Sequence, residues 1–272
     1  MTRILGVDFS GASDAGRKIW IAEGRHNAKG AFALVSCIPA IDLPSSGAAP
    51  AEAIPALVRH IAGLGGIPGR AARVGCDFPF SLPRGQLEAR TWRGFVLGYA
   101  GRYATADTFR AAFRSQPEAA AFKRLTDREA RTPFNAHNLR LYRQTWWGIA
   151  GVLAPLVRKG AATVYPQQDL RAGKPALIEV CPASTLKSIG LYPSYKGRGA
   201  APRRARQRIL DGLIARGALA APPASLRKLL LDNEGGDALD AAIAAVATAQ
   251  ADLSGPPDAL QRLEGRVYYE IG

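Results

Sequence analysis

The chain has 272 residues, of which 47% are hydrophobic and 21% are charged, so it suits one large domain with a buried core and not a globally disordered chain. Lys and Arg total 36 against 22 Asp and Glu, and the resulting formal net charge of +14 attracts phosphate polyanions or acidic membranes. The alternative is an Arg-rich composition without functional meaning.

The N-terminus does not resemble a signal peptide, because Asp8 stands where such a peptide would have its apolar centre. No window reaches the roughly 18 consecutive apolar residues that a membrane span needs. We therefore expect a cytoplasmic protein. Cys37, Cys76 and Cys181 lie in apolar runs and are odd in number, which favours reduced core thiols over disulfides or a zinc site. The three histidines show no metal-ligand spacing.

Short apolar runs separated by turn-prone sequence open the chain and predict an antiparallel meander of three strands. The predicted strands are 3–10, 18–23 and 32–38. Apolar residues then recur every three or four positions, which predicts a helix over 54–64. A further short strand, 73–79, ends at a proline.

The middle of the chain is basic and helical, and we interpret residues 84–160 as a helical insertion within a single domain of residues 1–272. The elements predicted from here on are helices near 86–100, 105–125 and 139–159, a strand at 176–181, a basic stretch at 195–208 that runs into a helix, a helix at 237–250 and a strand at 266–271. Helices that cross between strands require a parallel or mixed sheet. We predict an α/β fold: a mixed sheet, with the antiparallel meander and parallel strands, flanked by helices.

Acidic residues interrupt the apolar strands at comparable places. They are Asp8, Asp77 and Glu179 in three strands, and Asp237 and Asp240, which open the late helix on one face. An acid inside an apolar strand is costly unless it is paired, hydrogen-bonded or metal-bound. Each one alone is easily structural, and helix-start aspartates are commonly N-caps. Together they indicate a functional site, because functional groups gather at strand ends in such sheets.

Clustered carboxylates suit Mg²⁺ or Mn²⁺, which prefer hard oxygen ligands and keep positions open for water and phosphate. One or two such ions activate water and stabilise the leaving oxygen of a phosphodiester. A positive surface would hold the rest of a nucleic-acid backbone. The acids and the basic surface therefore fit one hypothesis.

Four motifs occur in an order typical of one known family. They are Ile4–Ala12, Val74–Pro79, Ile178–Ala183 and Gly236–Ala242, and the segment 264–268 looks like the end of that family's sequences. The chain resembles the predicted RNase H-like nucleases of the family called domain of unknown function 429. Each motif alone is weak, whereas the ordered set, which spans most of the chain, is more specific.

The resemblance implies an RNase H-like fold, with an antiparallel meander, alternating helices and strands, and acids that converge at the centre of the sheet. It also implies that Asp8 bridges the metal ions and that Glu179, Asp237 and Asp240 complete the metal site. Asp77 occupies the fourth-strand position that other members of the superfamily use, so all five acids are candidate catalytic residues.

Basic clusters flank these acids and are candidates for holding a phosphate backbone. The candidate substrate-binding residues are Ser10, Lys123, Arg124, Arg128, Arg131, Lys196, Arg198, Arg203 and Arg204. Taken singly, such basic residues more often belong to solvated helix faces. In the insertion, Arg140, Tyr142, Arg143 and Gln144 either line a substrate site or pack it, and core packing is favoured for Trp146 and Trp147.

Three functions remain open at this point. The leading hypothesis is a Mg²⁺- or Mn²⁺-dependent phosphodiesterase acting on DNA or RNA, which needs no catalytic histidine. The second is a phosphotransferase or nucleotide hydrolase, because Gly6–Gly11 also resembles the first phosphate loop of actin-like sugar kinases, although a second such loop is not evident. The third is a non-catalytic nucleic-acid-binding module on the same fold, whose binding would depend on salt and not on a divalent ion.

Overall fold

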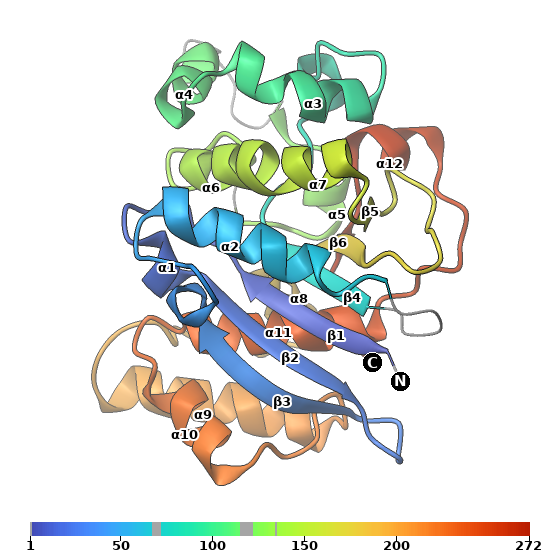
Figure 1. Ribbon diagram of the computed structural model, residues 1–272. Coiled ribbons are helices and arrows are strands. Elements are labelled where there is room, and N and C mark those ends of the chain that lie inside the picture. The colour runs from blue at the N-terminus through green and yellow to red at the C-terminus, as the bar shows by residue number, and fades with distance from the viewer. Residues whose placement is uncertain (1, 67–71, 115–121, 134) are drawn as a thin grey trace.

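The computed structural model describes residues 2–66, 72–114, 122–133 and 135–272, which are arranged around one mixed β-sheet of seven strands (Figure 1). The strands are β1 (Arg3–Asp8), β2 (Trp20–His26), β3 (Phe32–Pro39), β4 (Ala72–Asp77), β5 (Thr163–Val164), β6 (Ala176–Val180) and β7 (Val267–Tyr268). Their order across the sheet is β3-β2-β1-β4-β6-β5, and β7 also pairs with β6. The predicted α/β class with a mixed sheet is confirmed.

The first three strands form the predicted antiparallel meander, in which β1 pairs with β2 and β2 with β3. β1 then pairs in parallel with β4, β4 with β6, and β6 with both β5 and β7. Each parallel pairing requires a crossover connection. Helices lie in these connections, except between β5 and β6, which residues 165–175 join without a helix. As a result the carboxyl ends of β1, β4 and β6 lie at one edge of the sheet.

Helices cover both faces of the sheet (Figure 1). They are α1 (Ala15–Lys18), α2 (Pro50–Ala62), α3 (Trp92–Arg102), α4 (Ala106–Arg114), α5 (Leu125–Glu129), α6 (Tyr142–Trp146), the π-helical stretch Trp147–Leu153, α7 (Ala154–Lys159), α8 (Pro182–Ser188), α9 (Ala200–Ala215), α10 (Ala224–Asp232), α11 (Asp237–Gln250) and α12 (Ala259–Glu264). Among the described residues, none of these helices combines the length and apolar character that a membrane crossing requires.

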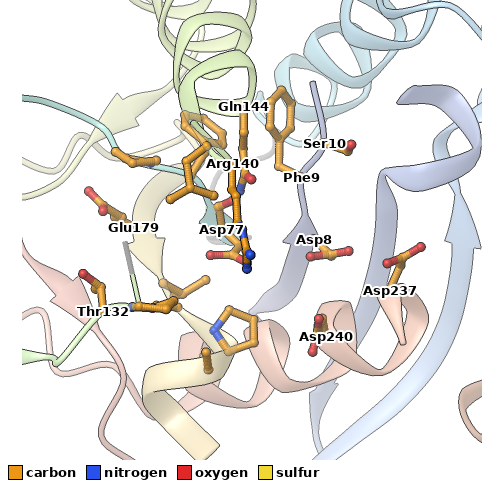
Figure 2. Close-up of a pocket in the computed structure, with 18 of the residues that line it drawn as sticks. Asp8, Phe9, Ser10, Asp77, Thr132, Arg140, Gln144, Glu179, Asp237 and Asp240 are labelled. Carbon is orange, nitrogen blue, oxygen red and sulfur yellow. The ribbon is translucent and has the colours of Figure 1, made fainter. Parts of the chain in front are cut away.

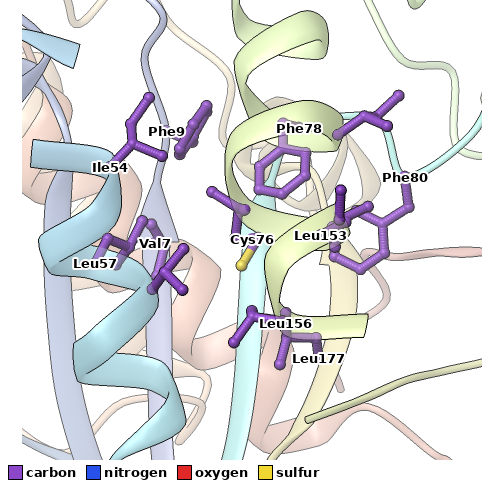
Figure 3. Close-up of a cluster of buried hydrophobic side chains, with 14 of the residues drawn as sticks. Val7, Phe9, Ile54, Leu57, Cys76, Phe78, Phe80, Leu153, Leu156 and Leu177 are labelled. Atoms are coloured by element: carbon purple, nitrogen blue, oxygen red, sulfur yellow. The ribbon is translucent and has the colours of Figure 1, made fainter. Parts of the chain in front are cut away.

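Strand alternation separates the two faces. Leu5 and Val7 of β1 belong to the main hydrophobic core, which packs against α2 and the helices of the insertion (Figure 3). The residues between and after them, Gly6 and Asp8, face the opposite way, toward α11, because successive side chains of a strand point to opposite faces. The same alternation puts Cys76 of β4 in the main core and directs its neighbours toward α11.

Helix α11 lies unusually close to the sheet because glycine stands at the contact. A Cβ atom on Gly6 would come within 2.1 Å of the backbone nitrogen of Ala245, and one on Gly75 within 1.9 Å of the Thr248 hydroxyl. The facing residues of α11 are mostly alanines, and the helix is buried along almost its whole length. This close approach fixes the start of α11 beside the carboxyl ends of β1 and β4.

Several predicted element boundaries are corrected by the structure. The first strand ends at Asp8 and not at residue 10, and the helix predicted from 86 begins at Trp92, where the Thr91 hydroxyl accepts a hydrogen bond from Gly94 N–H. The single helix predicted over 105–125 is wrong: α4 is followed, after residues 115–121, which lie outside the described part, by the separate helix α5. Strand β5 and helices α1, α8, α10 and α12 were not predicted from the sequence.

Predictions for the cysteines and tryptophans are confirmed. Cys37, Cys76 and Cys181 are free and buried. Trp146 and Trp147 pack against the main core with their rings 4.9 Å apart, and the Trp146 indole N–H donates to the Tyr103 carbonyl at 2.7 Å.

Candidate functional site

A cavity of about 440 Å³ opens at the carboxyl ends of β1, β4 and β6. All five acids that the sequence analysis selected line it: Asp8, Asp77, Glu179, Asp237 and Asp240. In Figure 2 their carboxyl groups form a row from Glu179 through Asp77 and Asp8 to Asp237, with Asp240 below on α11. Residues separated by more than 200 positions in the sequence therefore share one cavity.

Asp8 and Asp77 end two neighbouring parallel strands and are directly paired in register. Adjacent strands are about 4.8 Å apart, and residues paired in register on parallel strands project to the same face. Both carboxylates therefore lie side by side on the α11 face of the sheet. Only 8% of the Asp8 surface is exposed.

Asp237 and Asp240 occupy the first turn of α11, one helical turn apart on the side that faces the strand ends. Both oxygens of Asp240 have partners: the Tyr195 hydroxyl donates to Oδ1 at 2.6 Å, and Lys196 Nζ lies 2.6 Å from Oδ2. Asp237 is more exposed and lies 3.9 Å from Lys18 Nζ. The partly positive N-terminus of the helix also favours negative charge in this turn.

Four aspartates thus lie close together, with the ammonium groups of Lys18 and Lys196 beside them and with Arg140 lining the same cavity. Burial raises the pKa of Asp8 well above its usual value, and the neighbouring Asp240 and Asp77 carboxylates raise it further. Burial and Asp240 raise the pKa of Asp77 to about 7, and burial raises that of Asp237. For Lys196, Asp240 and Asp8 outweigh burial and raise the pKa, so the amine is charged. The carboxylates disfavour one another's charge, so the metal-free cluster retains protons that a bound cation would displace.

Glu179 lines the same cavity but is held differently. It pairs in register with Cys76 and not with Asp77, so it lies on the face of the sheet opposite to the aspartates. Arg124 binds it through two contacts, 2.8 Å to Oε2 and 2.5 Å to Oε1, and Phe80 N–H donates to Oε2 at 3.0 Å. The carboxylate that the resemblance implies as a metal ligand therefore has a guanidinium partner.

Arg124 is itself buried, with 1% of its surface exposed, and it joins several segments. Its Nε and Nη2 each donate to Asp127 at 2.9 Å, and Nη1 donates to the Glu264 carbonyl at 3.1 Å. The Glu264 carboxylate accepts from Arg84 N–H at 2.7 Å and Leu125 N–H at 2.9 Å. This network attaches the insertion and the C-terminal segment to the edge of the sheet.

Of the candidate substrate-binding residues, only some lie at the cavity. Ser10, Arg124 and Lys196 line it, together with Arg140, for which the sequence left open whether it lines a substrate site or packs it, and with Lys18, which was not predicted. The remaining candidates are not among its lining residues: Lys123, Arg128, Arg131, Arg198, Arg203 and Arg204. Arg198 and Arg203 instead form ion pairs with Glu234 and Asp232 at 2.9 Å.

The insertion contributes one wall of the cavity through Arg140, Leu141 and Gln144. The Gln144 side chain donates to the backbone carbonyl of Asp77, so it also holds the end of β4. Tyr142, in contrast, is buried in the core with its hydroxyl 3.1 Å from Asp107. The insertion thus both lines the site and packs it.

Sequence reasoning missed Asp127 and Tyr195 as partners of site residues. Asp127 is the third residue of α5, a position where an acid usually caps the helix, and the sequence does not show that it also holds Arg124. Tyr195 directly precedes Lys196, which was predicted to bind substrate, and this position in the sequence was the feature from which Tyr195 could have been predicted.

The oxygens of the aspartates are the ligand type that Mg²⁺ and Mn²⁺ prefer. Among residues 2–66, 72–114, 122–133 and 135–272, however, no three His, Cys, Asp or Glu side chains converge as a preformed metal cage. Mg²⁺ is usually held by one or two carboxylates, with waters and substrate phosphates as the other ligands. The paired carboxylates Asp8 and Asp77 fit that kind of site.

Comparison with family models gives one match, which extends over residues 6–258 and so includes all five acids of the cavity. The searches against curated proteins and against solved structures found no match. The match covers most of the chain, which therefore belongs to the family described as "Protein of unknown function (DUF429)".

Proposed function

We propose that the protein hydrolyses phosphodiester bonds of DNA or RNA with the help of a Mg²⁺ or Mn²⁺ ion held by the aspartate cluster. The observation that carries the proposal is the meeting of Asp8, Asp77, Asp237 and Asp240 in one cavity, where burial and mutual repulsion raise the pKa values of Asp8 and Asp77. A bound divalent cation would favour the ionised form of these carboxylates.

The architecture supports an RNase H-like fold. An antiparallel meander is followed by parallel strands, and β1 lies at the centre of the sheet between β2 and β4. The first-strand acid, Asp8, stands at the carboxyl end of this central strand, and the late helix α11 brings two further acids to the same point. These are the features that the family resemblance implies.

Asp8 and Asp77 are the residues that would hold the cation first, because their carboxylates are neighbours on one face of the sheet. Asp240 and Asp237 lie next to them and add negative charge. When bound, the cation would polarise a phosphate oxygen and lower the pKa of a water molecule. The Arg124 guanidinium already neutralises Glu179, so we assign that acid to the buried network and propose a single cation.

The walls of the cavity supply groups that attract and orient a phosphodiester. Lys18, Arg140 and Ser10 all line it, and Ser10 lies in the loop that follows β1. A lysine ammonium holds phosphate as a point charge, and an arginine guanidinium holds it with a planar fork of N–H donors. The net charge of +14 adds a long-range attraction for the rest of a nucleic-acid backbone.

The test is cleavage of labelled single-stranded, duplex and branched DNA and RNA in the presence of Mn²⁺. We expect the wild type to cleave at least one substrate, and Asp8→Asn to lose the activity while retaining its circular-dichroism spectrum. Asp211→Asn is the matched control, because it removes an acid that pairs with Arg227 at 2.7 Å and does not line the cavity. A wild type that is inactive on the whole panel would contradict the proposal.

The same preparations distinguish a non-catalytic binding module. If nucleic acid binds equally well to wild type and Asp8→Asn, with or without Mg²⁺, and only salt weakens the binding, the acids are not needed for function. Binding with cleavage that requires both Asp8 and the divalent ion supports the nuclease.

A further inference from the structure

Lys196 reaches into the aspartate cluster from the loop between α8 and α9. Its side chain is 56% exposed, yet its Nζ atom lies 2.6 Å from Oδ2 of Asp240, whose side chain is only 4% exposed. The same ammonium also acts electrostatically on Asp8, Asp77 and Asp237. One amine therefore forms an ion pair with Asp240 and lowers the pKa values of the three other aspartates.

The backbone on both sides of Lys196 is anchored by Arg206, which is buried with 2% of its surface exposed. Arg206 Nη1 donates to the carbonyls of Tyr195 at 2.6 Å and Gly197 at 3.2 Å, and its Nε donates to Leu231 at 2.8 Å. The backbone at Lys196 is thus fixed, whereas its side chain lines the cavity and is largely exposed. Such a side chain can exchange its partner without unfolding the loop.

Both oxygens of Asp240 are occupied in this arrangement, one by the Tyr195 hydroxyl and the other by Lys196. The ammonium in contact with Oδ2 of Asp240 repels a divalent cation that approaches the same oxygen.

We propose that Lys196 is a tethered cation that neutralises the aspartate cluster until a divalent metal ion displaces it. The inference rests on the metal-dependent function proposed above and adds the residue that sets how strongly the site takes up its metal. The ammonium and the metal ion compete for Asp240, so Lys196 weakens metal binding. In the metal-free protein the same ammonium reduces the repulsion between the aspartates. After displacement, the amine remains at the mouth of the cavity, where a phosphate group approaches.

The first test is Mn²⁺ binding by titration calorimetry, with no nucleic acid present. Lys196→Gln removes the competing charge and is expected to lower the Kd for Mn²⁺ by about tenfold or more, because an ammonium and a divalent ion near one carboxylate repel each other strongly. Lys228→Gln is the matched control: it breaks a 2.7 Å ion pair with Asp232 away from the cavity and leaves the Kd unchanged.

The second test measures displacement directly. In the wild type without metal, the Lys196 amine is held by Asp240, and its rate of acetylation, followed by mass spectrometry, is expected to be low. Addition of Mn²⁺ should raise that rate severalfold and leave the rate at Lys228 unchanged.

The outcomes separate this inference from the proposed function. Equal Mn²⁺ affinity in wild type and Lys196→Gln, or an acetylation rate that does not respond to Mn²⁺, overturns the tethered cation and leaves the metal-dependent function standing. A protein that binds no Mn²⁺ in either form overturns both. Tighter binding by Lys196→Gln together with metal-dependent exposure of the amine supports both.

Discussion

Replacing Asp77 with asparagine should stabilise the metal-free protein at alkaline pH. The pKa of this carboxyl is about 7, against an ordinary value of 3.8, because burial and Asp240 disfavour its charge. A difference of about three pH units corresponds to roughly 4 kcal/mol, since each unit is worth about 1.4 kcal/mol. Part of that cost belongs to the interaction with Asp240, so we expect the Asp77→Asn variant to gain about 2–4 kcal/mol.

The pH dependence has a defined sign. A group whose pKa is raised by folding contributes stability that is fully present below its unfolded pKa and is lost as the pH rises through its folded pKa. For Asp77 the loss extends from about pH 4 to above pH 7. Wild type and Asp77→Asn should therefore be similar in stability near pH 4, and the variant should be more stable at pH 8.5.

The assay is urea unfolding with a chelator present, at pH 4.5 and at pH 8.5. Asp232→Asn is the control, because Asp232 is an acid in ion pairs with Arg203 and Lys228, which lower its pKa, and its loss should not stabilise the protein. Mn²⁺ should stabilise the wild type more than Asp77→Asn and so reduce the difference. If the two proteins have the same stability at pH 8.5, the electrostatic reasoning about the cluster is wrong.

Two further predictions concern the supports of the site. Arg124→Gln leaves the buried carboxylates of Glu179 and Asp127 without their guanidinium and should cost about 3–5 kcal/mol in chemical denaturation; a loss below about 1 kcal/mol would show that the network is not needed. Gly6→Ala places a methyl group within 2.1 Å of the α11 backbone and should lower the melting temperature strongly, or prevent folding. Gly98→Ala is the control, because Gly98 lies in a helix with open space around it; this substitution should leave the free energy of unfolding unchanged or raise it by about 0.5–1 kcal/mol. Equal effects of the two glycine substitutions would refute the close approach of α11.

The strands and the acids at their ends were predictable because both depend on local patterns. Apolar runs of strand length, closed by glycine or proline, marked β1, β4 and β6, and an acid in such a run is rare enough to be noticed. Helix α11 was predicted from its alanine-rich pattern and its paired aspartates. These patterns can be identified in the sequence without knowing which segments are in contact in the folded chain.

The insertion was less predictable because its helices are short and depend on tertiary contacts. The segment predicted as one helix over 105–125 contains α4 and, further on, the separate start of α5 at Leu125. Helix propensity is a weak prior that packing overrides. Directly before α5, the buried Arg124 binds the Glu179 carboxylate and the Glu264 backbone carbonyl, both more than 50 residues away, which no local pattern encodes.

The sequence by itself was enough to select the five acids that line the cavity, because each interrupts an apolar strand or opens a helix. Only the tertiary structure decided which of these acids lie together on one face of the sheet. Strand register pairs Asp8 with Asp77, so both lie on the same face of the sheet. Glu179 is instead paired with Cys76. It therefore lies on the opposite face, where it forms an ion pair with Arg124. A side chain's face depends on register, and register depends on pairing between distant segments, which is a property of the folded chain and not of any local stretch.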